Sequence, residues 1–97
     1  MADIRIQYFG SIRAAAQKAE EDAAIAESIT VLQLLQRLAD VHGDGFGGEI
    51  LAAGGTALRD DLTVMLNGTI LKHEASGDSL LRPGDVLALF PIFPGGG

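Results

Sequence analysis

The sequence contains no cysteine, and this absence removes several kinds of chemistry at once. Without a thiol, the chain has no disulfide framework, no cysteine nucleophile and no cysteine ligand for a metal ion. Cysteine usage therefore leaves the redox compartment undecided. Histidine is also scarce, since His42 and His73 are the only two, and no acid stands at a zinc-motif spacing from either. We expect no metal site on this chain.

Basic residues are few as well, with 7 Lys and Arg against 13 Asp and Glu and a net charge of -6. Binding to a nucleic-acid backbone needs clustered Lys and Arg, so we expect no nucleic-acid partner. An acidic chain favours a protein partner with a basic docking face. No apolar run approaches the roughly 20 residues of a membrane span. The first three residues lead into a strand pattern without a signal peptide, so we expect no membrane association and a cytoplasmic location.

The composition that remains is that of one folded domain. The chain has 97 residues, of which 47% are hydrophobic and 21% charged, a balance typical of a globule rather than of a disordered chain. We find no internal repeat and no linker. We expect a domain over residues 1–90 and an extended C-terminal tail over residues 91–97.

The first quarter of the chain gives one clear signal and one ambiguous one. Residues 4–9 alternate apolar and polar side chains, which predicts a strand. Ser11 is a suitable N-cap for a short helix over residues 12–18. The Ala- and Glu-rich residues that follow have strong helix propensity, so propensity alone predicts one long helix over residues 11–27.

The strongest local pattern lies at Thr30 and Gln33, which have the spacing of a capping box. Apolar residues recur at helical spacing after it, and Gly43 provides a stop. This predicts a helix from residue 31 to about residue 42. We expect His42 at its C-terminus, where the helix dipole favours a cation.

Residues 43–61 are rich in glycine and difficult to interpret. Residues 43–48 match G-x-G-x-x-G, but they follow a helix rather than a strand, so we expect a cap and loop instead of a nucleotide site. Residues 49–53 are expected to form one helical turn. The acids at 20–22 and 60–61, and Lys72, are expected to be solvated.

The last third of the chain reads as strands and turns. Residues 62–66 and 69–72 are predicted strands joined by Asn67 and Gly68, which favour a type I′ hairpin turn. Asp78 is predicted to cap a helical turn that runs through Leu81. Residues 82–85 predict a type II turn by their Pro-Gly centre, and a strand over residues 86–90 follows.

The strand at residues 86–90 is apolar on both faces, although a helix can cover only one face of a small sheet. We expect the other face to expose Phe9, Met65 and the side chains on one face of the last strand, either Val86, Ala88 and Phe90 or Leu87 and Leu89. An apolar patch of this kind on a small domain marks a partner-binding surface. The alternative is that residues 43–61 and 72–80 cover it.

The tail combines two prolines with a glycine run. Pro91 and Pro94 favour extended backbone, and glycines without Cβ atoms allow a chain end to enter a slot that is too narrow for side chains. Fully extended, the seven residues reach roughly 23 Å. We expect a free carboxylate on Gly97 that reaches into another protein's active site. The alternative is a frayed end or an expression scar.

The order of these elements resembles the ubiquitin-like sulfur carriers of the MoaD/ThiS superfamily, and most closely the small subunit of molybdopterin synthase. The resemblance is carried by residues 4–9, 28–31 before Leu34 and Leu35, 64–68, 81–86 and the tail. It implies an α+β, β-grasp fold with a mixed sheet of four to five strands packed on one main helix. It also implies a strand, rather than a helix, at residues 23–27.

For function, the resemblance implies that Gly97 is the reactive residue and that Gly96 threads the partner's slot beside it. An E1-like adenylyltransferase (MoeB/ThiF type) activates the carboxylate with ATP and Mg, and a sulfur donor converts it to a thiocarboxylate. The large synthase subunit (MoaE-like) then accepts the tail and moves sulfur into a pterin precursor. Partner contacts are expected at Phe9, Met65, Phe90, Ile92, Phe93, Pro94 and Gly95. The third glycine, Gly95, departs from the usual pattern.

The chain itself is expected to bind no cofactor and to catalyse nothing alone, since it has no phosphate-binding motif of the type G-x-x-x-x-G-K-[ST]. Other pathways stay open at this point: a carrier for thiamine or cysteine synthesis, or a modifier conjugated to lysines. Thiamine carriers tend to be shorter. A plain β-grasp binding module with an idle tail is the remaining alternative.

Overall fold

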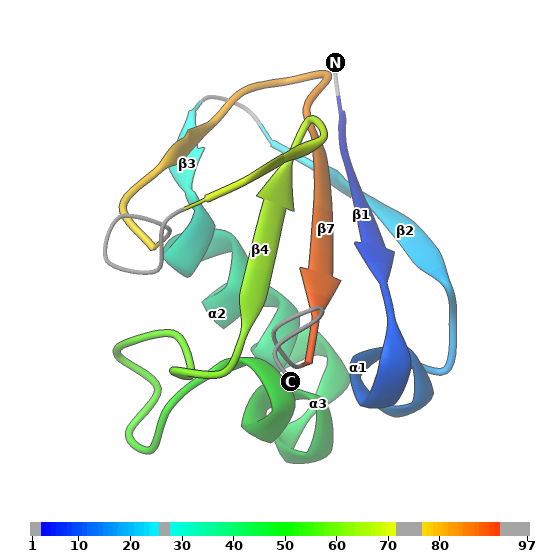
Figure 1. The fold of residues 1–97 in the computed structure, drawn as a ribbon, viewed down its shortest axis with the longest axis vertical. Helices are drawn as coiled ribbons and strands as arrows, with labels where there is room; N and C mark the ends of the chain where they lie inside the picture. The colour runs from blue at the N-terminus through cyan, green and yellow to red at the C-terminus, as the bar shows by residue number, and fades with distance from the viewer. Residues whose placement is uncertain (1–2, 26–27, 72–76, 92–97) are drawn as a thin grey trace.

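A computed structural model of the protein describes residues 3–25, 28–71 and 77–91. Five strands form one mixed sheet in the order β2-β1-β7-β4-β5, and the helices lie on one of its faces (Figure 1). The two central strands, β1 and β7, run parallel, and the other neighbours are antiparallel. The strands are β1 (Asp3–Tyr8), β2 (Glu20–Ala24), β4 (Thr63–Leu66), β5 (Thr69–Ile70) and β7 (Val86–Phe90). This agrees with the mixed sheet of four to five strands that the resemblance implies.

The core lies between this sheet and α2 (Val31–His42), the longest helix. Alternation in the two central strands places Ile6 beside Leu87 and Tyr8 beside Leu89 on the covered face. All four are at most 1% exposed. Burying an aliphatic or aromatic side chain of this size contributes about 1.5–3 kcal/mol. The helical stripe that meets them consists of Val31, Leu34, Leu35 and Leu38, all buried.

The start and end of α2 confirm the prediction. Thr30 Oγ1 accepts the backbone N–H of Gln33 at 3.1 Å, and the Gln33 side chain accepts the Thr30 N–H at 2.9 Å. Gly43, at φ 95°, follows the last residue and donates its N–H to the Ala39 carbonyl. His42 is the terminal residue of the helix, as expected.

Two tight turns also confirm the local reading. Asn67 and Gly68 have φ of 51° and 86°, and positive values at both centres define the type I′ hairpin. Gly84 has φ of 95°, and the Asp85 N–H donates to the Arg82 carbonyl at 3.1 Å, as in a type II turn. Asn67 Nδ2 donates to Asp85 Oδ1 at 3.0 Å and so joins the two turns.

The long helix that propensity favours over residues 11–27 does not form. Helix α1 spans Gly10–Ala16 and ends at Gln17, which has a left-handed φ of 62°. β2 then pairs with β1 over residues 20–24, so the strand implied at 23–27 exists but begins three residues earlier. Backbone pairing with β1 at five positions wins over helix propensity. Arg5 on β1 lies opposite Asp22 and bonds both Glu20 and Asp22, at 3.1 and 2.9 Å, which adds to the pairing.

The predicted N-cap of this first helix is also wrong. Phe9 occupies the cap position with extended backbone and no side-chain cap bond. Ser11 lies inside the helix, where its hydroxyl donates to Glu49 Oε1 at 2.6 Å. The helix begins and ends two residues before the predicted range of 12–18, because the backbone N–H of Arg13 already bonds the Phe9 carbonyl.

The glycine-rich segment holds a third helix, α3 (Asp44–Ile50), where the sequence predicted a loop followed by a turn at 49–53. Phe46 and Ile50 lie one turn apart and are both buried, which supplies the stabilisation that its glycines lack. Gly47 lets α3 approach α2, since a Cβ there would lie 3.2 Å from the Ala39 Cβ.

The helical turn predicted to run through Leu81 is a strand instead. β6 (Leu80–Leu81) pairs antiparallel with β3 (Ile29–Thr30) as a separate two-stranded sheet just before α2. The Val31 N–H donates to the Ser79 carbonyl, which extends the pairing. β5 is shorter than the predicted strand 69–72, and Lys72 and His73 lie outside the described residues.

Candidate functional site

The C-terminal end of β7 is where the predicted tail begins. β7 lies between β1 and β4, so Phe90 ends a central strand rather than an edge strand. The tail therefore starts from the middle of the sheet. The predicted reactive residues Gly96 and Gly97, and the predicted contacts Ile92, Phe93, Pro94 and Gly95, lie outside the described residues.

The sheet face opposite the helices is largely apolar around this point. We call it the outer face, and its apolar members are Phe9, Met65, Ile70, Val86, Ala88 and Phe90. Met65 pairs with Ala88 on one side and Ile70 on the other, which places the three in one row across β7, β4 and β5. Phe9 and Phe90 stack with ring centroids 4.4 Å apart and planes 9° apart.

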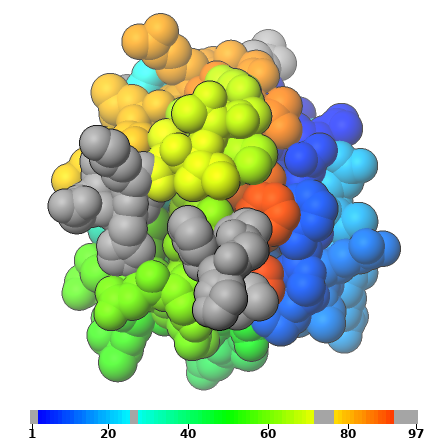
Figure 2. Space-filling view, viewed as in Figure 1, coloured from blue at the N-terminus to red at the C-terminus, as the bar shows by residue number. Residues whose placement is uncertain are grey.

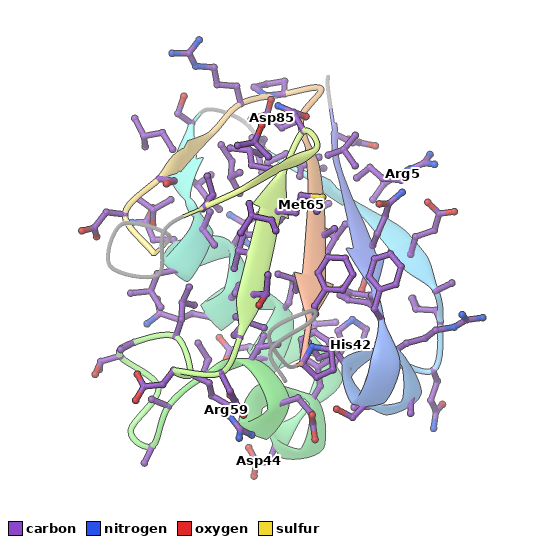
Figure 3. The ribbon with its side chains drawn as sticks, in the orientation of Figure 1. Arg5, His42, Asp44, Arg59, Met65 and Asp85 are labelled. Carbon is purple, nitrogen blue, oxygen red and sulfur yellow. The ribbon has the colours of Figure 1, made fainter. Side chains whose placement is uncertain are left out.

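Much of the outer face is accessible. Ile70 is 48% exposed, Phe9 39% and Val86 36%, while Met65 and Phe90 are half-buried. Figure 2 shows β7 atoms at the surface between β1 and the β4–β5 hairpin, so the described loops leave this part open. Figure 3 shows Met65 over the middle of the sheet. The fold thus brings together the three predicted contacts that it describes.

Ile70 is an outer-face residue that the sequence reading missed. Its signal was present, because a type I′ turn at Asn67 and Gly68 fixes the hairpin register and sets Ile70 opposite Met65. The outer face ends at charged residues toward β2. Arg5 bonds Glu20 and Asp22 there, so these two acids are ion-paired rather than merely solvated.

The third acid of that run, Glu21, has a different environment on the helix side of the sheet. Its Oε2 accepts the Tyr8 hydroxyl at 2.5 Å and lies 2.6 Å from His42 Nε2. His42 also packs against Phe46, with ring centroids 4.8 Å apart. This Tyr8–Glu21–His42 cluster joins β1, β2 and α2, and the expectation of a solvated Glu21 is wrong.

Burial and the hydrogen bonds in this cluster perturb two groups. Burial, and then the bond to Glu21, raise the pKa of Tyr8 far above its usual range. For Glu21, partial burial acts to raise the pKa, but the bonds from Tyr8 and His42 together outweigh it and hold the pKa below its usual range. The cluster is a structural contact and faces away from the outer face.

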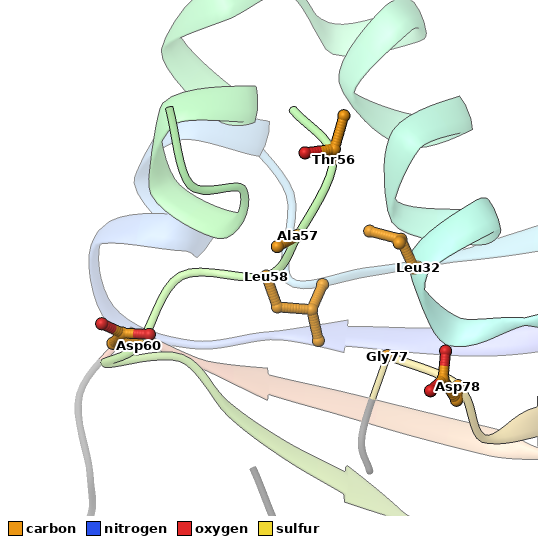
Figure 4. Close-up of a pocket in the computed structure, with 7 residues that line it drawn as sticks. All are labelled: Leu32, Thr56, Ala57, Leu58, Asp60, Gly77 and Asp78. Atoms are coloured by element: carbon orange, nitrogen blue, oxygen red, sulfur yellow. The ribbon is translucent and has the colours of Figure 1, made fainter. Parts of the chain in front are cut away.

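A shallow groove of about 280 Å³ lies between the N-terminal part of α2 and residues 56–60 (Figure 4). Leu32, Leu58, Asp60 and Asp78 are among its lining residues. It is not at the end of β7. Within residues 3–25, 28–71 and 77–91, no three His, Asp or Glu side chains are grouped to hold a metal ion. None of the described helices is long and apolar enough to span a bilayer.

Comparison with known proteins identifies the family of this chain. The model of the ThiS family matches residues 6–96. The chain belongs to the ThiS family. This membership confirms the resemblance to the ubiquitin-like sulfur carriers. No curated protein matches the sequence.

Solved structures extend the comparison. The putative molybdopterin converting factor subunit 1 from Pyrococcus furiosus shares 26% identity with a TM-score of 0.72, over 96% of this chain and 100% of that one. A thiamine biosynthesis protein (ThiS) from Geobacter metallireducens shares 25% identity with a TM-score of 0.51, over 96% and 99%. The small archaeal modifier protein 1 of Haloferax volcanii shares 22%, with a TM-score of 0.78 over 96% and 100%, which shows a common fold. The α+β, β-grasp fold is confirmed.

Proposed function

We propose that this ThiS-family protein is the sulfur carrier of a molybdopterin synthase and that Gly97 carries the sulfur as a C-terminal thiocarboxylate. The observation that carries the proposal is the family match over residues 6–96, which includes the tail as far as Gly96. The choice of molybdopterin over thiamine is supported by the TM-score of 0.72 to the putative molybdopterin converting factor subunit, against 0.51 to the thiamine biosynthesis protein at nearly the same identity.

The chemistry needs an activated acyl group. A C-terminal carboxylate, with a pKa near 3.5, is ionised at neutral pH and resists attack by a nucleophile. One of its oxygens attacks the α-phosphorus of ATP, and pyrophosphate leaves. A sulfur nucleophile then attacks the acyl carbon of Gly97, the bond to AMP breaks, and a thiocarboxylate remains. When the sulfur passes to the pterin precursor, water restores the carboxylate.

The partners carry the catalysis in this proposal. An E1-like adenylyltransferase of the MoeB/ThiF type binds ATP and Mg, a sulfur donor supplies the nucleophile, and a MoaE-like large subunit receives the tail. This chain binds no cofactor and acts as a co-substrate. Its own contribution to docking is the part of the outer face formed by Met65 and Ile70, which provide apolar contact area. The net charge of -6 favours encounter with a basic partner face.

Reconstitution tests the proposal. The purified chain is incubated with the E1-like enzyme, ATP, Mg and a sulfide source, and its intact mass is followed. We expect a gain of about 16 Da as oxygen is replaced by sulfur, and no gain in a variant that lacks Gly96 and Gly97. The protein that carries the thiocarboxylate should then support molybdopterin formation when the large subunit and the precursor are added.

Other outcomes separate the alternatives. If the thiocarboxylate forms on Gly97 but delivers sulfur only to a thiazole or cysteine pathway, the carrier role stands and the role in molybdopterin synthesis is rejected. We call the formation of this thiocarboxylate charging. Adducts on lysines of other proteins would identify a modifier. Absence of any charging with an active E1-like enzyme would reject the carrier role.

A further inference from the structure

Gly10 has a constraint that the carrier chemistry does not by itself explain. It is the first residue of α1, separated from the end of β1 by Phe9 alone, and has a positive φ of 57°. A Cβ built at Gly10 would lie 2.6 Å from Cγ and 3.1 Å from Cδ of Pro91, distances at which the proline ring must move. Gly10 therefore serves two purposes, because its backbone conformation favours glycine and its bare surface is filled by the ring of Pro91.

Neighbouring contacts hold Pro91 in this position. The Phe9 N–H donates to the Leu89 carbonyl at 3.2 Å, which continues the β1–β7 pairing up to the proline. The rings of Phe9 and Phe90 stack beside it, 4.4 Å between centroids. Backbone pairing, ring stacking and the absent side chain thus act on three consecutive residues, 89 to 91. We call Phe9, Gly10 and Phe90 the Pro91 seat.

We propose that the Pro91 seat positions the reactive tail, so that Gly10 is a positioning residue for the acyl-transfer reactions of Gly97. This inference rests on the proposed function. Whatever path residues 92–97 take, it begins at Pro91, so the place and direction of Pro91 fix one end of the path. Six residues extend at most roughly 20 Å, and a small change in direction at the root moves the far end by several times as much.

Gly10→Ala is expected to slow the reaction of the tail without weakening the docking of the carrier. Recognition by the activating enzyme is expected to use Met65 and Ile70 of the outer face, which pair across β4 and β5 and which Gly10→Ala leaves in place, so KM for the carrier should change by less than about twofold. Delivery of the Gly97 carboxylate to the bound ATP depends on the position of Pro91, where the tail begins. Misplacing a reacting group by about 1 Å can cost up to about 100-fold in rate, so we expect kcat for charging to fall about tenfold.

A matched control isolates the seat from backbone strain. Gly55 also has a positive φ, 74°, but a Cβ there would meet nothing within 4 Å. Gly55→Ala should therefore reproduce the conformational cost of Gly10→Ala and leave kcat unchanged. Thermal unfolding of both variants checks that each is folded at the assay temperature.

A double-mutant cycle tests the contact itself. Pro91→Ala removes the ring atoms nearest to Gly10 and is expected to lower kcat alone. If both residues act through the seat, Gly10→Ala combined with Pro91→Ala should be no slower than Pro91→Ala. If the fold-losses in kcat of the two single variants multiply in the double variant, the two residues act separately and the proposal is overturned.

A readout independent of activity completes the test. In the uncharged wild-type protein, nuclear Overhauser contacts between the Gly10 Hα and the Pro91 Hγ protons should be present, and their absence would overturn the seat. If the wild type is charged normally and Gly10→Ala is charged at the same rate, the positioning role is wrong while the carrier function stands. If the wild type is not charged but the contact is present, the carrier function fails instead.

Discussion

Replacing Tyr8 by phenylalanine tests whether the Tyr8–Glu21–His42 cluster stabilises the domain. The substitution keeps the ring, which is buried among the core side chains and only 1% exposed, and removes the hydroxyl that donates to Glu21 at 2.5 Å. No cavity of methyl size is created. The change in stability therefore reports the hydrogen bond to the carboxylate and little else.

The magnitude follows from the environment of the acceptor. Hydrogen bonds to a charged group contribute about 1.5–3 kcal/mol. The Glu21 side chain is 18% exposed, so water can partly replace the lost donor, and this favours the lower end of the range. We expect a loss of about 1.5 kcal/mol at pH 7, which for a domain of this size lowers Tm by about 6–12 °C.

The pH dependence of the stability difference provides a second check on the bond between Tyr8 and Glu21. Folding holds the pKa of Glu21 below its ordinary value of 4.5, so ionised Glu21 contributes stability above pH 4.5 that is lost as the pH falls through the folded pKa. The Tyr8 bond is one cause of that lowered pKa. The difference between wild type and Tyr8→Phe should therefore shrink as the pH drops below 4.5.

The assay is urea or thermal unfolding at a series of pH values, with Ser11→Ala as the control. Ser11 also donates a hydroxyl to a carboxylate, Glu49, but at an exposed position, so its loss should cost less than about 0.5 kcal/mol. A Tyr8→Phe protein as stable as the wild type at pH 7, or a gap that widens in acid, would refute the reasoning.

Three further predictions concern other parts of the molecule. Thr30→Ala removes half of the capping box and should cost about 1 kcal/mol in urea unfolding, with no effect on charging once folded. Asn67→Ala should cost about 1–2 kcal/mol, because it strains a residue at positive φ and removes the bond to Asp85; Asn67→Gly should recover the strain part but not the bond. Met65→Glu should weaken association with the activating enzyme or the large subunit about tenfold by calorimetry, whereas Val41→Glu, on an exposed helix position, should not.

Elements defined by nearby residues were predictable from the sequence. The capping box at Thr30 and Gln33 and the turn at Asn67 and Gly68 depend on chemistry within four residues, and both form as expected. α3 was missed because its glycines hide it from propensity. Its usable signal was Phe46 and Ile50 at helical spacing, behind Asp44 in the first turn.

Features that depend on strand register could not be read in the same way. The start of β2 is set by its pairing with β1, in competition with strong local helix propensity. The Tyr8–Glu21–His42 cluster joins residues 13 and 21 positions apart, so it exists only once the sheet and α2 are assembled. On the outer face, alternation left open which side chains of the last strand lie beside Met65, and the register that pairs Met65 with Ala88 decides for Val86, Ala88 and Phe90.

The central claim is that one acyl terminus of this small domain carries sulfur. The most direct test is intact and tandem mass spectrometry of the protein isolated from its own cells under non-reducing conditions. We predict a species heavier by about 16 Da, with the added mass confined to Gly97. A mature chain that continues beyond residue 97, or a sulfur found on any other residue, would contradict the account.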